Sequence, residues 1–130
     1  MFSLDTNTLI YFFKGLGRVL QALLSVAPAE VAIPSVVLDE LELGIAQSSQ
    51  PGRRREQLDA LLAAVTVLPL DLASARRAAE MSSSLLRTGK GIGPTDTLIA
   101  GIALANRATL VIHNTKEFRR VRGLDLADWY

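Results

Sequence analysis

The residue types and positions that point most clearly to chemistry in this 130-residue sequence are four acids: Asp5, Glu40, Asp96 and Glu117. Carboxylates that gather in one place repel one another and raise each other's pKa unless a cation compensates. Mg²⁺ and Mn²⁺ prefer such oxygen ligands, and two of these divalent ions would balance the four negative charges. In a two-ion centre, one ion can activate water while the other stabilises the leaving oxygen of a phosphodiester.

Asp5 follows the apolar run of residues 2–4, which predicts a short buried strand. In open parallel sheets, ligands bind just beyond the carboxyl ends of the strands, which is where Asp5 is expected to lie. Asp5 also begins a predicted helix, whose N-terminal amides favour an anion. A helix cap would explain the same position, so position alone leaves capping and catalysis both open.

Glu40 is separated from its acidic neighbours by helix geometry, because each residue turns a helix by about 100°. Relative to Glu40, Gly44 lies at about 40°, Asp39 at about −100° and Glu42 at about 200°. Only Glu40 then borders the apolar stripe, where a carboxylate needs a hydrogen bond, a cation or a proton. Gly44 leaves room beside it. The alternative is a boundary residue that reaches solvent, and Asp39 and Glu42 are predicted to lie on a solvated face.

Asp96 lies at the start of the almost wholly apolar helix predicted for residues 95–106. Such a helix is buried on most sides, so its first turn emerges from the core at one definite place. Thr95 can serve as the N-cap, which leaves Asp96 free to bind a ligand. Stabilisation of the helix dipole is the alternative role for Asp96.

Glu117 and Asn114 follow the strand predicted for residues 109–112, again beyond a carboxyl end. His113 lies beside them and is the only histidine of the chain. A lone histidine more often makes a structural hydrogen bond than it ligates a metal, so His113 is expected to have no metal.

The elements that must position these acids alternate between strands and helices. Short apolar runs predict strands at residues 2–4, 31–33, 67–70, 109–112 and 124–126. Caps, breakers and periodicity predict one or two helices after Asp5 and further helices at residues 35–48, 54–65, 72–88 and 95–106, with a break at Pro51-Gly52. The alternation predicts an α/β fold, in which a single domain over residues 1–130 has a short, mostly parallel β-sheet of four to five strands covered by helices on both faces.

The composition is that of one globular domain, with 49% hydrophobic and 21% charged residues. Cysteine is absent, which excludes disulfides, thiolate metal sites and cysteine-based catalysis. The sequence has neither the roughly 18-residue apolar run of a membrane span nor a secretory signal. We therefore expect a cytoplasmic protein without a membrane partner.

Four motifs, in order, resemble those of the PIN-domain ribonucleases, in particular the VapC-type toxins of prokaryotic VapBC toxin–antitoxin pairs. The similarity extends from Leu4 to Trp129. Each motif is weak alone, whereas four with this spacing are specific. The matching segments are Leu-Asp-Thr-Asn at residues 4–7, Glu-Leu-Glu-Leu-Gly at 40–44, Asp-Thr-Leu-Ile-Ala at 96–100, and Asn-Thr-Lys-Glu-Phe at 114–118 with the closing residues Val121, Gly123-Leu124 and Asp128-Trp129.

The resemblance implies a metal-dependent endoribonuclease that hydrolyses RNA phosphodiester bonds. Asp5, Glu40 and Asp96 would hold Mg²⁺ or Mn²⁺, with Glu40 acting directly or through water. Glu117 or Asn114 would complete the pocket. The resemblance also selects Glu40 over its neighbour Glu42, as the helix geometry does.

Thr6 and Asn7 would support this pocket without touching the ion, again by resemblance. One residue departs from the family pattern, because members usually carry threonine where Ile112 stands. Any hydroxyl contact near the fourth acid would be lost here. The expected consequence is at most slower or altered metal binding.

The resemblance further implies the toxin of a type II toxin–antitoxin pair, which inhibits translation and growth when free of antitoxin. The RNA substrate would be structured, such as transfer RNA. A VapB-type antitoxin would cover the pocket and place an arginine among the carboxylates, and the toxin would form a homodimer. The sequence itself predicts a protein interface, because the region after Asp5 has more apolar residues than a small core can hide. These are Phe12, Phe13, Leu16, Leu20, Leu23 and Leu24.

Binding of RNA would require cations around the acidic pocket, because phosphate contacts supply most of the affinity. The candidates are Arg53, Arg54, Arg55, Lys90, Arg119, Arg120 and Arg122. An ordinary solvated face is the alternative for each run. Aromatic residues make up only 5% of the chain, which favours recognition of RNA shape over stacking on unpaired bases.

Two other functions fit parts of the pattern. An aspartyl phosphotransferase would use Asp5 as a nucleophile. That chemistry typically has a second aspartate two residues later, where this chain has Asn7. A non-catalytic binding module of the same fold would use its acids only to attract a basic peptide.

Overall fold

A computed structural model describes all 130 residues and contains one five-stranded sheet in the order β3-β2-β1-β4-β5. Every neighbouring pair of strands is parallel. The α/β prediction is confirmed, and the sheet is entirely rather than mostly parallel. The strands are β1 (Phe2–Leu4), β2 (Val31–Pro34), β3 (Thr66–Leu68), β4 (Thr109–Val111) and β5 (Leu126–Ala127).

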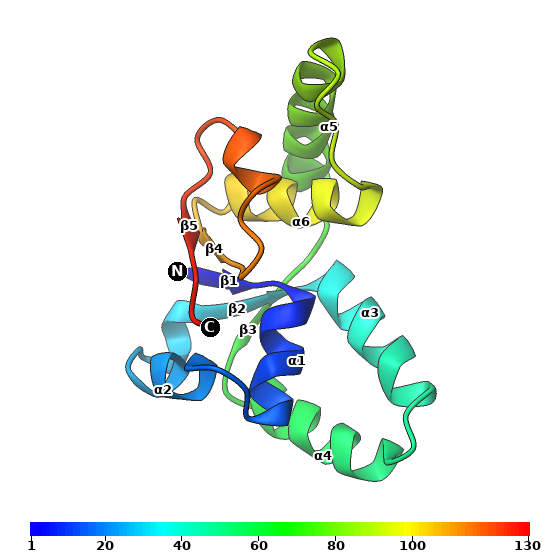
Figure 1. Ribbon diagram of the computed structural model, residues 1–130, viewed down its shortest axis with the longest axis vertical. Coiled ribbons are helices and arrows are strands. Elements are labelled where there is room, and N and C mark those ends of the chain that lie inside the picture. Colours follow the sequence, from blue (N-terminus) through cyan, green and yellow to red (C-terminus); the bar gives the residue numbers. More distant parts are fainter.

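Helices cover both faces of this sheet, as predicted (Figure 1). Helices α1, α2 and α4 lie on one side and α5 and α6 on the other (Figure 1). Helix α3 extends from the carboxyl end of β2 and contacts α1, α4 and α6. The helices are α1 (Thr6–Lys14), α2 (Val19–Leu24), α3 (Ser35–Ala46), α4 (Pro51–Leu62), α5 (Leu72–Arg87) and α6 (Pro94–Ala105), with 3-10 turns η1 (Pro28–Glu30) and η2 (Phe118–Arg120).

Strand order places Asp5 where the chain changes direction across the sheet. From β1 the chain proceeds to β2 and β3 on one side, then crosses to β4 on the other side of β1. Ligands of open α/β sheets bind at this kind of switch point, beyond the carboxyl ends of the strands. The topology therefore predicts a ligand-binding site between the carboxyl ends of β1 and β4.

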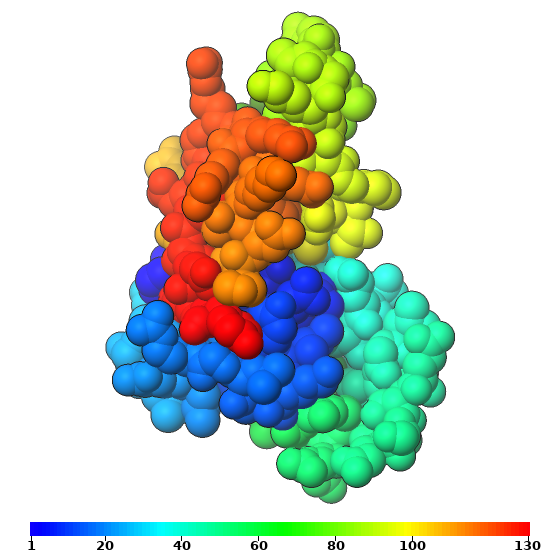
Figure 2. Space-filling model, in the orientation of Figure 1, coloured from blue at the N-terminus to red at the C-terminus, as the bar shows by residue number.

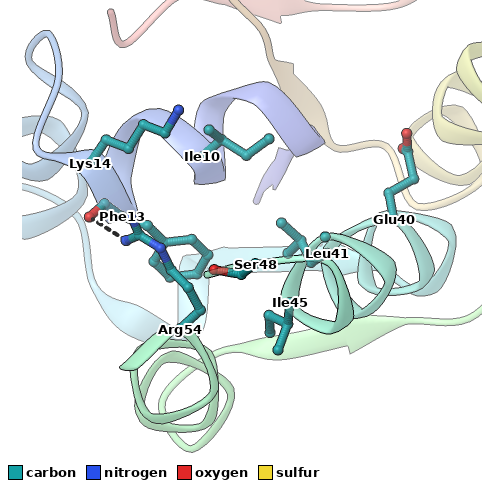
Figure 3. A pocket seen from close by; sticks show the side chains of 9 residues that line it. Ile10, Phe13, Lys14, Glu40, Leu41, Ile45, Ser48 and Arg54 are labelled. Carbon is teal, nitrogen blue, oxygen red and sulfur yellow. Dashed lines mark hydrogen bonds between the residues drawn. The ribbon is translucent and has the colours of Figure 1, made fainter. Parts of the chain in front are cut away.

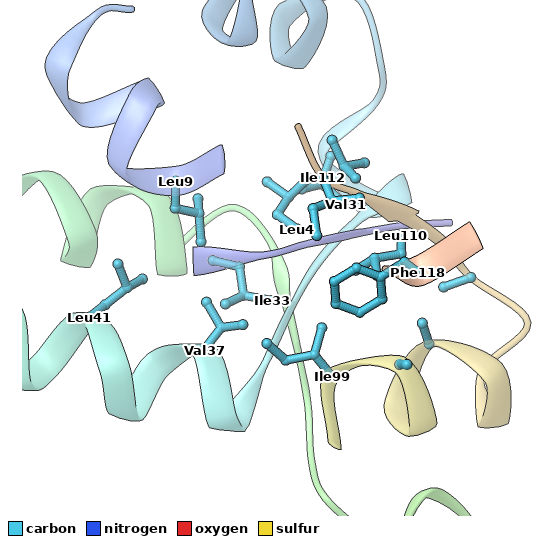
Figure 4. Close-up of a cluster of buried hydrophobic side chains, with 14 of the residues drawn as sticks. Leu4, Leu9, Val31, Ile33, Val37, Leu41, Ile99, Leu110, Ile112 and Phe118 are labelled. Atoms are coloured by element: carbon cyan, nitrogen blue, oxygen red, sulfur yellow. The ribbon is translucent and has the colours of Figure 1, made fainter. Parts of the chain in front are cut away.

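The core is built from side chains that the helices direct onto the sheet (Figure 4). Leu9 of α1, Val37 of α3 and Ile99 of α6 are each at most 2% exposed. They belong to one buried cluster with Leu4 and Ile33 of the central strands. Burying a side chain of this kind contributes roughly 1.5–3 kcal/mol, so the N-terminal halves of α1, α3 and α6 are held firmly against the sheet.

Several predicted boundaries were wrong. Helix α4 begins at Pro51 rather than at residue 54, because proline is favoured in the first turn, where its missing N–H costs nothing. Helix α6 begins at Pro94 for the same reason, so Gly93 rather than Thr95 is the N-cap. The strands predicted at residues 67–70 and 124–126 are shifted to β3 and β5.

The predicted start of α5 is confirmed. Asp71 is the N-cap, and its Oδ1 accepts a hydrogen bond of 2.9 Å from the Ser74 N–H. None of the helices is sufficiently long and apolar to span a membrane.

Candidate active site

Asp5 caps α1 at the carboxyl end of β1. Its Oδ1 accepts a hydrogen bond of 2.8 Å from the Thr8 N–H, and the residue is only 6% exposed. The Asp5 N–H and the Thr8 hydroxyl both donate to the Val111 carbonyl oxygen, at 3.2 and 3.1 Å. These bonds fasten the start of α1 to the end of β4. Capping occupies one carboxylate oxygen, so it does not exclude a second role.

Glu40 reaches the same region from α3. The Thr6 hydroxyl of α1 donates a hydrogen bond of 2.6 Å to Glu40 Oε1, which links the two helices. The glutamate is exposed, and it borders the buried stripe of α3, because it lines one groove together with Leu41 and Ile45. The expected space beside it is present, because a Cβ added at Gly44 would meet no atom within 4 Å.

The neighbouring acids of α3 do not join the site. Glu42 accepts two hydrogen bonds from the Arg55 guanidinium of α4, which lower the pKa of the glutamate. Asp39 is exposed. Glu42 was predicted to be merely solvated, whereas it forms an ion pair between two helices.

Asp96 is the third residue of α6 and is half-buried at the N-terminal end of that helix. Burial raises its pKa, and the negative charges of Glu117 and Glu40 raise it further. Burial also raises the pKa of Asp5, with smaller contributions from Asp96 and Glu40 and an opposing effect of the Thr8 hydrogen bonds. Asp96 is therefore electrostatically coupled to each of the other three acids.

No basic side chain neutralises these four carboxylates. The four salt bridges of the chain involve Glu30, Glu42, Glu80 and Asp128 instead. Asp5 is buried and Asp96 is half-buried, and negative charges in such surroundings without a counter-charge favour a bound cation. No three histidine or acidic side chains are close enough to hold an ion by themselves. An ion here would therefore need ligands beyond the protein, and Mg²⁺ usually keeps several waters.

The remaining predicted site residues lie nearby but make fewer contacts. Glu117 directly precedes η2 and is exposed. Asn7 and Asn114 are exposed, and neither side chain has a hydrogen-bond partner within the chain. Ile112 is 5% exposed and belongs to the hydrophobic core, so an apolar side chain suits this position. Of the predicted supporting residues, Thr6 donates a hydrogen bond to an acid of the site, whereas the side chains of Asn7 and Asn114 do not.

The predicted cationic residues differ in how freely they could meet a phosphate. Arg55 is paired with Glu42, and Arg54 donates to the Phe13 carbonyl oxygen and the Gln57 side chain. Arg53 is exposed on α4. The other predicted cations are Lys90, Arg119, Arg120 and Arg122. All four are exposed and form no salt bridge. Lys90, Arg120 and Arg122 line one hollow between α5 and η2.

A groove between α1, α3 and α4 leads away from Glu40 (Figure 3). Its walls are mostly apolar, and Lys14 and Arg54 lie at its far end. The Glu40 carboxylate points away from these two cations and from the apolar side chains (Figure 3). The apolar lining residues are Ile10, Phe13, Leu41 and Ile45.

The apolar residues after Asp5 divide into two groups. Phe12, Phe13 and Leu23 pack against the core. Leu16, Leu20 and Leu24 are 43%, 50% and 76% exposed. The core therefore leaves part of this set uncovered, as predicted.

Comparison with known proteins identifies the family. Residues 3–124 match the PIN domain. A protein of Shigella flexneri named tRNA(fMet)-specific endonuclease VapC is 34% identical over 128 residues, which cover 98% of this chain and 97% of that protein. The chain of VapBC2 from Rickettsia felis, solved bound to a DNA fragment from its promoter, has 32% identity and a TM-score of 0.91, with coverage of 99% and 98%. DNA-bound VapBC from Salmonella typhimurium gives 30% identity and a TM-score of 0.91. The chain therefore belongs to the PIN-domain family and is similar over nearly its whole length to proteins named VapC.

Proposed function

We propose that this protein is a metal-dependent endoribonuclease that acts as the toxin of a type II toxin–antitoxin pair. The observation that carries the proposal is the placement of Asp5 at the switch point of the sheet, with Glu40 joined to the next residue through the Thr6 hydroxyl and Asp96 in the first turn of α6, none of them paired with a basic side chain. The similarity to proteins named as VapC endonucleases supports the same conclusion.

The residues present fit Mg²⁺ or Mn²⁺. Asp5, Asp96 and Glu40 offer oxygen donors, as hard divalent ions require, and Glu117 adds a fourth beside Asp96. One or two ions would be held, with water completing the coordination. A bound ion of this kind supplies an activated water and stabilises the negative charge that develops on a phosphodiester during cleavage.

The protein's own side chains position this chemistry. The Thr8 N–H fixes the Asp5 carboxylate, and the Thr6 hydroxyl fixes that of Glu40. Both donors belong to the first turn of α1, so one short helix orients two acids. Lys90, Arg120 and Arg122 would attract RNA phosphates toward the centre, while Arg54 and Arg55 are already engaged.

The substrate class follows from the relatives. The Shigella flexneri protein is named for cleavage of tRNA(fMet), and we propose a structured RNA, of which transfer RNA is the first to test. An aspartyl phosphotransferase fits less well, because this chain has Asn7 where such chemistry typically has a second aspartate.

A VapB-type antitoxin is the proposed partner, since the solved relatives are named as VapBC complexes. The apolar groove that ends at Glu40 suits an apolar partner segment that brings a cation to the acids. We also propose a homodimer that buries the exposed leucines of α2 and its preceding loop. Light scattering after gel filtration should give twice the monomer mass for the free protein, and a Leu24→Glu variant should give the monomer.

The proposed activity is tested by sequencing RNA ends after expression of the wild type, Asp96→Asn and Asp39→Asn. Asp39 is an exposed acid of α3 and provides a matched control. Discrete new ends should appear with the wild type and the control and be absent with Asp96→Asn. Equal cleavage by all three proteins would refute the acidic centre as the site of cleavage. Binding of an antitoxin without any cleavage by the wild type would favour the non-catalytic module.

A further inference from the structure

Both tyrosines and the only histidine of this aromatic-poor chain meet on one surface. His113 stacks on Tyr130 with ring centroids 4.3 Å apart and an interplanar angle of 27°. Tyr11 lies edge-on to both rings, with centroid distances of 6.0 Å to His113 and 4.8 Å to Tyr130. We call these three residues the ring cluster. The segments that carry them, blue for α1, orange after β4 and red at the chain end, meet on the visible face of the molecule (Figure 2).

The cluster holds the His113 ring in a fixed orientation. Its Nδ1 lies 3.1 and 3.2 Å from the two carboxylate oxygens of Asp128, while Nε2 has no partner. Tyr130 is held from behind, because a Cβ added at Gly17 would lie 2.9 Å from its ring. Both stacked residues are exposed, Tyr130 by 41% and the His113 side chain by 44%.

This surface adjoins the proposed active site. His113 lies two residues after Val111, whose carbonyl oxygen accepts hydrogen bonds from Asp5 and Thr8. Tyr11 belongs to α1, about 9 Å along the helix axis from its Asp5 cap at 1.5 Å per residue. A short single-stranded segment bound at the acids could therefore reach the rings.

We propose that the ring cluster is a nucleobase-binding subsite, in which an unpaired base near the cleaved phosphodiester stacks on the exposed ring of His113. The proposal rests on the proposed nuclease function. Unpaired bases of RNA are commonly read by stacking on aromatic side chains, and an imidazole nitrogen without a partner can add a hydrogen bond. A clasp that merely fastens the chain end explains Tyr130 and Asp128, but it does not require an exposed His113 ring.

The first experiment uses the fact that His113 is the only histidine, so its ring-proton NMR signals need no assignment. Single-stranded RNA is titrated into the Asp96→Asn variant, which should bind without cleaving. Stacking predicts an upfield shift of the His113 signals that saturates with RNA. An oligonucleotide with abasic residues should leave them in place. Signals that do not move while RNA binds would overturn the proposal.

The second experiment compares two variants at the same position. His113→Phe keeps an aromatic ring, whereas His113→Leu keeps apolar bulk without one. The leucine variant should bind single-stranded RNA about tenfold more weakly and the phenylalanine variant within about twofold of the parent, as expected for one lost stacking contact. Circular dichroism checks that each variant is folded. If one variant does not fold, the NMR titration alone tests the subsite.

Equal affinities of folded leucine and phenylalanine variants would contradict the subsite. This outcome differs from failure of the nuclease proposal. RNA cleavage that survives Asp5→Asn would refute the metal centre and leave base stacking on His113 to be judged by the titration.

Discussion

Asp5 serves the fold and the proposed chemistry with the same carboxylate. Its Oδ1 caps α1, while burial raises its pKa above the ordinary value of 3.8. Between 3.8 and the raised value, the folded protein binds this proton more tightly than the unfolded chain does. The contribution of Asp5 to the free energy of unfolding is therefore greatest at low pH and is lost as the pH rises through this window.

Replacing Asp5 with asparagine should abolish the decrease in the free energy of unfolding that accompanies ionisation of Asp5. Asparagine is an equally good helix cap and carries no charge. In EDTA at pH 7, Asp5→Asn should melt a few degrees above the wild type, since about 1 kcal/mol corresponds to roughly 4 °C for a domain of this size. Near pH 4 the difference should shrink. Thermal melts followed by circular dichroism check both points, and identical melting at pH 7 would show that the buried charge costs nothing.

Thr6 should matter for activity rather than for stability. Its hydroxyl fixes Glu40 from the neighbouring helix, and the side chain is only half-buried. Thr6→Val should lower RNA cleavage about 10- to 100-fold, as is typical when a group that orients a ligand is removed. Thr6→Ser keeps the hydroxyl and should retain most of the activity. Cleavage rates measured on one RNA distinguish the two variants. A fully active valine variant would show that cleavage does not depend on the hydrogen bond from Thr6 to Glu40.

At the scale of elements, the buried strands and helices could be predicted because their apolar periodicity is strong. The first strand, the helix after Pro34 and the Asp71 cap all lie where the pattern placed them. The predicted start of α6 was wrong, because proline is favoured in the first turn of a helix and Pro94 therefore places the cap at Gly93 rather than at Thr95. The hydrogen bond from Thr6 to Glu40 could not be predicted, because it depends on the angle between two helices.

The contact between α5 and α6 depends on a glycine. Helix α5 packs on α6 at Gly101, where an added Cβ would lie 2.6 Å from the Ala78 Cβ. Gly101→Ala should therefore destabilise the protein by roughly 1–3 kcal/mol through overpacking. Ala78→Gly combined with it should recover little of the loss, because the added Cβ would also lie 2.9 Å from the Ala78 Cα and backbone N. Urea unfolding of the two proteins checks this, and a single variant as stable as the wild type would show that the helices can move apart.

At the scale of the molecule, some arginines form ion pairs within the chain and others remain free to bind phosphate. Arg55 is neutralised by Glu42, whereas Arg120 is exposed beside Glu117 and forms no ion pair. Arg120→Ala should weaken RNA binding and lower the slope of log affinity against log salt by about one. Arg55→Ala should change the slope little. Binding titrations at several salt concentrations test this, and equal slopes for the two variants would place the RNA elsewhere.

The central claim is that Asp5, Glu40 and Asp96 bind a divalent cation, directly or through water that completes its coordination. Electron paramagnetic resonance of free Mn²⁺, titrated with purified protein, measures this binding without reference to catalysis. The wild type and Asp39→Asn should remove Mn²⁺ from solution with the same affinity, and Asp96→Asn should bind it at least about tenfold more weakly. Equal Mn²⁺ binding by all three proteins, or none by the wild type, would contradict the metal centre.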